Sequence, residues 1–199
     1  MTEIPDIASW PESTAADLRK VADEVAASAA PECLGEKRLS FGSLAEHAGD
    51  AIDQLTTSGI IDRDRCVYVL TLDDGANVDD VKAAFENAKS LPDIKLPQDN
   101  GAVSNTLYVG SSCATKKRKG TLRSRLRHHL IKAPKGTYAL SLAQWTSHLK
   151  GGLILRAWQF PSAGEGNEGD LAARRVVLAV EDWLSNELKP ILGRRGSRN

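Results

Sequence analysis

The sequence predicts an α+β protein in which a small three-stranded antiparallel sheet is flanked by helices. Short runs of β-branched and aromatic residues at 66–72, 106–109 and 153–160 are typical of buried strands. The segments around them repeat apolar residues at helical spacing, and loops rich in Pro, Gly and Asn separate the elements. Three strands with several helices make an α+β domain.

Residues 1–62 are predicted to form a helical N-terminal extension. The segment 13–30 begins with cap-type residues and carries apolar side chains at helical spacing until Pro31 stops it. The segment 40–59 repeats this pattern, and its final glycine is suited to end a helix. No residue of the extension suggests chemistry, so we expect it to dock, to form a homodimer or to act as a scaffold.

Residues 63–199 are predicted to form the second unit, which contains the three strands. Helices are expected there over residues 77–90, 121–131, 141–149 and 171–188. Three tryptophans lie in apolar segments and are expected in the core rather than as platforms for stacked bases, namely Trp145, Trp158 and Trp183.

The composition indicates an ordinary water-soluble protein of 199 residues, with 41% hydrophobic and 26% charged side chains. Its longer apolar runs, such as 176–180, are too short to cross a bilayer, and we see no signal-peptide pattern. The three cysteines, Cys33, Cys66 and Cys113, are scattered and form no CxxC pair. Reduced thiols and a cytoplasmic location are therefore expected.

The net charge of zero conceals a strong asymmetry along the chain. Residues 1–100 carry 9 basic and 20 acidic side chains, whereas residues 101–199 carry 17 basic and 6 acidic ones. Such a chain can present a cationic face to phosphates, although the two halves could also simply neutralise each other. The cations predicted to contact nucleic acid, rather than only to be solvated, are Lys116, Lys117, Arg118, Lys119, Arg123, Arg127 and Lys132.

Five residues stand in an order that suggests a site. Tyr68 and Tyr108 lie in the first two predicted strands, where a tyrosine most often packs in the core. Arg125 and His129 are four residues apart and so project from the same face of a helix. Glu181 lies at the edge of the apolar stripe of the last helix.

The four motifs that contain these residues resemble the GIY-YIG nuclease family. The stretch C-V-Y-V-L stands where that family has its G-I-Y strand, and L-Y-V-G-S-S stands where it has Y-I-G. The helix R-L-R-H-H is similar to the R-L-x-x-H of the family, and V-E-D-W-L-S-N-E-L-K-P-I-L-G is similar to its closing segment. The resemblance covers roughly residues 63–196.

The resemblance implies a divalent-metal-dependent DNA endonuclease. Tyr68 would take a proton from the attacking water, Tyr108 and His129 would complete a hydrogen-bond network, and Arg125 would form two hydrogen bonds with a phosphate. Glu181 would hold Mg²⁺ or Mn²⁺, hard ions that bind through one or two carboxylates plus water and phosphate. A tyrosine base needs its usual pKa of about 10 lowered, and nearby cations, Arg125 and the metal, would lower it.

Some alternatives stay open at this point. Periodicity alone does not distinguish Glu181 from Asp182 or Glu187, and only the register of the motif does. Cys66 replaces the first glycine of the family pattern, and Gly193 stands where the family has asparagine. We expect Gly193→Asn to leave activity unchanged or to raise it. The alternative function is a non-catalytic nucleic-acid-binding module that keeps the nuclease fold.

Overall fold

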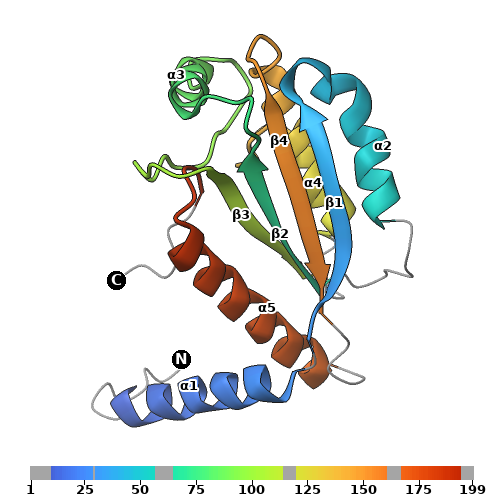
Figure 1. Ribbon diagram of the computed structural model, residues 1–199. Helices are drawn as coiled ribbons and strands as arrows, with labels where there is room; N and C mark the ends of the chain where they lie inside the picture. Colours follow the sequence, from blue (N-terminus) through green and yellow to red (C-terminus); the bar gives the residue numbers. More distant parts are fainter. Residues whose placement is uncertain (1–9, 29, 57–64, 114–119, 161–166, 194–199) are drawn as a thin grey trace.

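The computed structural model describes residues 10–28, 30–56, 65–113, 120–160 and 167–193. Their α+β architecture agrees with the sequence prediction, but the antiparallel sheet has four strands rather than three, in the order β1-β4-β2-β3 (Figure 1). The strands are β1 (Glu32–Ser40), β2 (Arg65–Leu72), β3 (Thr106–Cys113) and β4 (Gly152–Gln159). The α-helices are α1 (Trp10–Ala27), α2 (Leu44–Thr56), α3 (Val78–Ala88), α4 (Leu122–Leu130) and α5 (Asn167–Leu188).

The additional strand, β1, corrects the prediction that residues 1–62 are purely helical. It pairs antiparallel with β4, with a bulge between Cys33 and Gly35. Glu36 lies opposite Arg156 in this register, and the Arg156 guanidinium donates to the Glu36 carboxylate at 2.7 and 2.8 Å. The predicted boundary at residue 62 itself lies outside the described residues.

The two faces of the sheet are covered by different helices. On one face, buried residues of α2 and α4, such as Ile52 and Leu126, form a large core with Leu70 and Leu155 of the strands. On the other face, Val177 of α5 joins a smaller cluster formed by side chains of β2 and β3. Figure 1 shows α5 running beside β3, with α4 behind the sheet. This sandwich places α4 and α5 on either side of the edge strand β3.

The N-terminal helix α1 packs against α5 rather than against the sheet (Figure 1). The Arg175 side chain of α5 forms an ion pair with Glu24 of α1 at 3.0 Å. Leu18 of α1 remains 65% exposed. Homodimer formation through this region therefore stays a prediction.

The segment 141–149 forms only a short 3₁₀ helix, Leu142–Gln144, where a longer helix was expected. Ser141, just before it, has a left-handed backbone conformation, with φ 47°. The Trp145 indole donates to the Leu140 carbonyl at 2.7 Å, so the chain folds back on itself here instead of extending as a helix.

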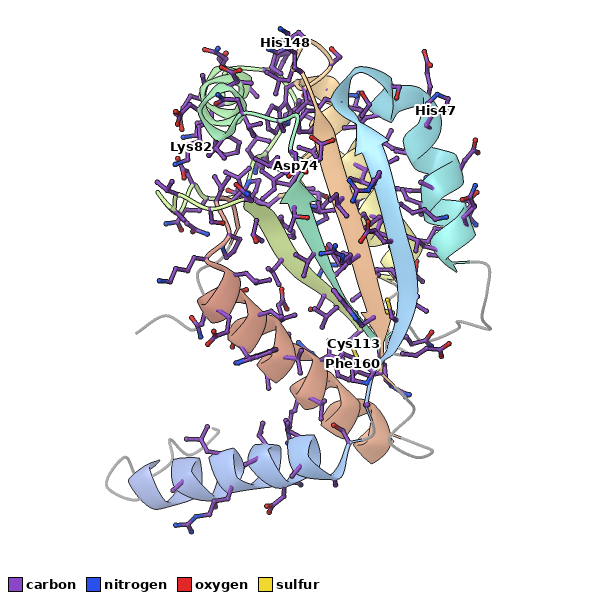
Figure 2. All side chains as sticks on the ribbon, viewed as in Figure 1. His47, Asp74, Lys82, Cys113, His148 and Phe160 are labelled. Atoms are coloured by element: carbon purple, nitrogen blue, oxygen red, sulfur yellow. The ribbon has the colours of Figure 1, made fainter. Side chains whose placement is uncertain are left out.

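The tryptophan prediction is correct for Trp145, which is buried, while Trp158 is half-buried. It is wrong for Trp183, which is 60% exposed on α5 because it lies off the stripe that includes Val177 and Leu184. No helix among the described residues is long and apolar enough to cross a membrane. Cys33 is exposed, Cys113 is half-buried and Cys66 is buried, and no disulfide links them. Figure 2 shows His47 on α2 and His148 at the far end of the sheet, and both are exposed.

Candidate functional site

Three aromatic side chains from three separate elements meet on the α4 side of the sheet. Tyr68 comes from β2, Tyr108 from β3 and His129 from α4. Their ring centroids lie 6.3 Å apart for the two tyrosines, 5.9 Å for Tyr68 and His129, and 4.5 Å for Tyr108 and His129. We call these three residues the aromatic cluster. The structure thus brings together three of the five residues that the resemblance selected.

Gly110 makes room for this cluster. It lies directly opposite Tyr68 in the ladder between β2 and β3. A Cβ at this position would lie 2.6 Å from the Tyr68 hydroxyl and 2.6 Å from the Tyr108 ring, closer than real side chains approach. Any residue with a side chain would therefore force the two tyrosines apart.

Gly193 supports the cluster from the outer side of Tyr108. Its φ is +115°, and a Cβ there would lie 2.9 Å from the Tyr108 ring. The Leu192 amide donates to the Leu107 carbonyl at 3.0 Å, which fixes the segment after α5 against the edge of β3. Asparagine would be strained in this backbone conformation and would push Tyr108 away. This strain argues against the expectation that Gly193→Asn leaves activity unchanged or raises it, and that expectation stays a prediction.

His129 is a buried, neutral histidine with a defined tautomer. The Leu140 amide donates to Nδ1 of His129 at 3.3 Å, so the ring proton of the neutral imidazole lies on Nε2. The pKa of His129 is lowered to about 3. Burial is the main cause, and the nearby charges of Arg125 and His128 act in the same direction. His129 can therefore donate one hydrogen bond from Nε2 near neutral pH, but it is not a base there.

Tyr68 is fully buried, and its acidity differs from the sequence expectation. Burial raises the pKa of Tyr68 well above its usual value of 10, and the neighbouring Tyr108 and Glu181 also raise it. The Arg125 guanidinium acts in the opposite direction, but its effect is smaller than that of burial. Arg125 thus acts in the expected direction, but burial outweighs it, so Tyr68 is a neutral phenol near neutral pH.

Arg125 lies beside the aromatic cluster at the surface of α4. Its side chain is exposed, whereas His129, one turn further along the helix, is buried. The charge of Arg125 lowers the pKa of His129 and opposes the rise in the pKa of Tyr68, in both cases as a smaller effect than burial. A guanidinium in this position can offer paired N–H groups to a phosphate from solvent.

Glu181 lies on the opposite face of β3 from the aromatic cluster. The Ser111 hydroxyl donates to the Glu181 carboxylate at 2.5 Å, which ties α5 to β3. Gly110 and Ser111 are consecutive in β3, so Gly110 faces the aromatic cluster on one side of the sheet and Ser111 faces α5 on the other. Asp182 and Glu187, the competing carboxylates, are exposed on α5.

Ser111 was not selected from the sequence, although a signal for it existed. Side chains alternate along a strand, so the residue after Gly110 must face the helix on the other side of the sheet. Val109, two residues earlier, packs in the cluster that α5 covers. A hydroxyl in an otherwise apolar position of that face indicates a polar partner on α5.

The predicted nucleic-acid contacts divide into three groups. Lys116, Lys117, Arg118 and Lys119 lie outside the described residues. Arg123 forms an ion pair with Asp53 of α2 at 2.8 Å, so its charge is already compensated. Arg127 and Lys132 are exposed and line one groove of the surface.

No protein-family model, curated protein or solved structure matches the chain. Within the described residues, no group of three or more His, Cys, Asp or Glu side chains could hold a metal ion together. The described residues therefore offer no ready-made cluster of ligands at Glu181, and a metal there would also need water and oxygen atoms of a bound phosphate as ligands.

Proposed function

We propose that this protein is a divalent-metal-dependent DNA endonuclease with a GIY-YIG-like site. One observation supports the proposal: residues far apart in the sequence lie next to the edge strand β3, with the aromatic cluster on one face of the strand and Glu181 on the other. Tyr108 and Gly110 contact one half of the site, and Ser111 contacts the other half, Glu181. Metal-dependent phosphodiester hydrolysis needs both a group that binds the phosphate and a group that binds the metal.

The donor set fits one hard divalent cation. Glu181 offers a half-buried carboxylate that Ser111 orients, and Mg²⁺ commonly binds through one carboxylate while it keeps several waters. When bound, the metal would activate water and neutralise charge on the phosphate. Arg125 would hold the non-bridging oxygens of the same phosphate from the α4 side.

Within the aromatic cluster, the roles that we propose differ from those that the family resemblance implies. Tyr108 is partly exposed, whereas Tyr68 and His129 are fully enclosed. We therefore place the Tyr108 hydroxyl in contact with the reacting water or phosphate. Tyr68, a neutral phenol, and His129, a donor through Nε2, would hold Tyr108 in position.

A plasmid-cleavage assay with Mg²⁺ or Mn²⁺ tests this function. Glu181→Gln keeps the shape of the side chain and loses the charge that binds the cation, so we expect cleavage to fall at least about 100-fold. DNA affinity without metal should stay the same or improve, because a negative charge is removed. Asp182→Asn and Glu187→Gln are matched controls on the same helix and should keep most of the activity. Loss of activity in either control, with Glu181→Gln still active, contradicts the assignment.

The tyrosine assignment needs a second pair of variants. Tyr108→Phe should slow single-turnover cleavage by about 10²–10⁴-fold, as expected when a hydroxyl acts directly in proton transfer. Tyr68→Phe should slow cleavage less than Tyr108→Phe does, because it removes a buried hydroxyl that only holds Tyr108 in position. If Tyr68→Phe is the slower enzyme of the two, the proton acceptor is Tyr68, as the family resemblance implies.

The second candidate function is a DNA-binding module without cleavage. Two observations favour it: the raised pKa of Tyr68, caused mainly by burial, and the neutral state of His129. Wild-type protein that binds DNA but cuts neither supercoiled nor branched DNA with either cation would establish this function instead.

A further inference from the structure

A groove of about 610 Å³ runs along the outer side of α4 and the chain that follows this helix. Ser124, Arg127 and His128 line it from α4, at the i, i+3 and i+4 spacing of a single helical face. Lys132 and Lys135 line it from the segment after the helix. Its volume is within the range of sites that bind small ligands or parts of larger ones.

The groove carries positive charge that the described residues do not compensate. Arg127 and Lys132 are exposed, and neither forms an ion pair with any of the described residues. Lys135 differs from them because it pairs with Asp93, also in the lining, at 2.7 Å. The groove therefore offers two free cations, one guanidinium and one ammonium, to an anion from solvent.

Hydrogen bonds at the end of α4 fix the backbone that carries these two side chains. The Arg127 carbonyl accepts hydrogen bonds from the amides of Ile131 and Lys132, at 2.9 and 3.1 Å. The His128 carbonyl accepts from the Ser141 amide at 3.3 Å. Carbonyls at the end of a helix usually repel anions, and these bonds reduce that effect.

The groove lies close to Arg125, because Ser124 and His128 of the same helix line it. His128 lines the groove and lies three residues from Arg125, which stands beside the aromatic cluster. The two side chains are close enough for the charge of Arg125 to contribute, after burial, to a lowered His128 pKa. A strand of DNA held by Arg125 would therefore continue directly over the groove.

We propose that this groove binds a backbone phosphate of DNA next to the phosphate held by Arg125, through Arg127 and Lys132. The inference rests on the proposed function and defines one place where the substrate is held outside the reacting centre. Contacts of this kind position the duplex without reading its sequence.

The test measures DNA binding in the absence of metal, so that cleavage does not interfere. Fluorescence anisotropy with a labelled 20-base-pair duplex in EDTA would compare the wild type with the double variant Arg127→Ala/Lys132→Ala. The double variant Arg19→Ala/Lys20→Ala is the matched control, because it removes the same two residue types from the exposed surface of α1. Urea unfolding of both double variants should match the wild type.

We expect the groove variant to lose about 10- to 100-fold in affinity near 0.1 M salt and its salt slope to flatten by about two. The control variant should keep both values, and a second duplex of unrelated sequence should give the same result. An unchanged affinity and slope in the groove variant overturns the proposal, even if the wild type cuts DNA with Mg²⁺. Conversely, the groove variant could lose affinity as expected while the wild type never cuts DNA. That result would support phosphate binding by the groove and refute the endonuclease function.

Discussion

The buried neutral state of His129 makes folding stability depend on pH in a way that can be calculated. The folded protein keeps this imidazole neutral down to a pKa of about 3, whereas in the unfolded chain it titrates near 6.5. Between these values the unfolded state binds more protons than the folded state, so acid favours unfolding. The contribution of His129 is fully present above pH 6.5 and is lost progressively as the pH falls toward 3.

The size of this effect at pH 5 depends little on the folded pKa. An unfolded histidine is almost fully protonated at pH 5, and the free-energy difference relative to pH 8 is about 2 kcal/mol. The same calculation gives about 3 kcal/mol at pH 4. These values hold as long as the folded pKa stays well below the pH of the measurement.

The perturbation is His129→Asn, which keeps an acceptor for the Leu140 amide and removes the titrating ring. Urea unfolding at pH 8 and at pH 5 would give the free energy of unfolding of each protein at both pH values. The variant will be less stable overall, but its loss between the two pH values should be about 2 kcal/mol smaller than that of the wild type. His148→Asn removes an exposed histidine and should behave like the wild type.

An equal pH dependence in the wild type and in His129→Asn would refute this account, because His129 would then titrate alike in both states. If the variant does not fold, NMR titration of the wild-type histidines supplies the same answer. The His129 resonances should show no protonation between pH 8 and pH 5. A transition within that range would mean that the imidazole is accessible and that the aromatic cluster is not closed.

Two further predictions concern residues that surround the site. Gly193→Asn should destabilise the fold by about 2 kcal/mol or more, because it combines a strained φ with a clash against Tyr108. It should also lower rather than raise the cleavage rate. A stable, fully active variant would disprove the clash. Ser111→Ala should raise the Mg²⁺ concentration needed for half-maximal cleavage by about 10- to 100-fold, since Glu181 loses the hydroxyl that orients it. Ser111→Thr should restore the wild-type requirement, and an unchanged requirement in Ser111→Ala would mean that the hydroxyl does not position the carboxylate.

Most of the fold could be predicted because its central elements have strong local patterns. The run that contains Tyr68 is buried at nearly every position, and Leu122, Leu126 and Leu130 repeat at the spacing of a helix. β1 lacks such a pattern, because it is an edge strand with the charged sequence Glu36-Lys37-Arg38 and a glycine bulge. Its partner lies far along the chain, so no local propensity could identify it.

The sequence predicted which residues belong to the candidate site, but not how deeply they are buried or how their pKa values are shifted. The order of the motifs located Tyr68, Tyr108 and His129, which do meet in space. The pKa values of Tyr68 and His129 could not be predicted, because burial determines both of them and burial depends on the packing of several elements. The conflict at Gly193 was equally hidden, since it arises from a ring 85 positions earlier in the sequence.

The pairing of β1 with β4 also constrains how the chain is made. Glu36 and its partner Arg156 are 120 residues apart, so β1 leaves the ribosome long before β4, its neighbour among the described strands, exists. At about 5–20 residues per second, this interval lasts roughly 6–24 s. The charges of β1 keep it soluble during that time, as charged side chains do on other unpaired edges. A nascent chain that has not yet produced β4 cannot complete the sheet, so the growing polypeptide should assemble the candidate site only after β4 and α5 have been made.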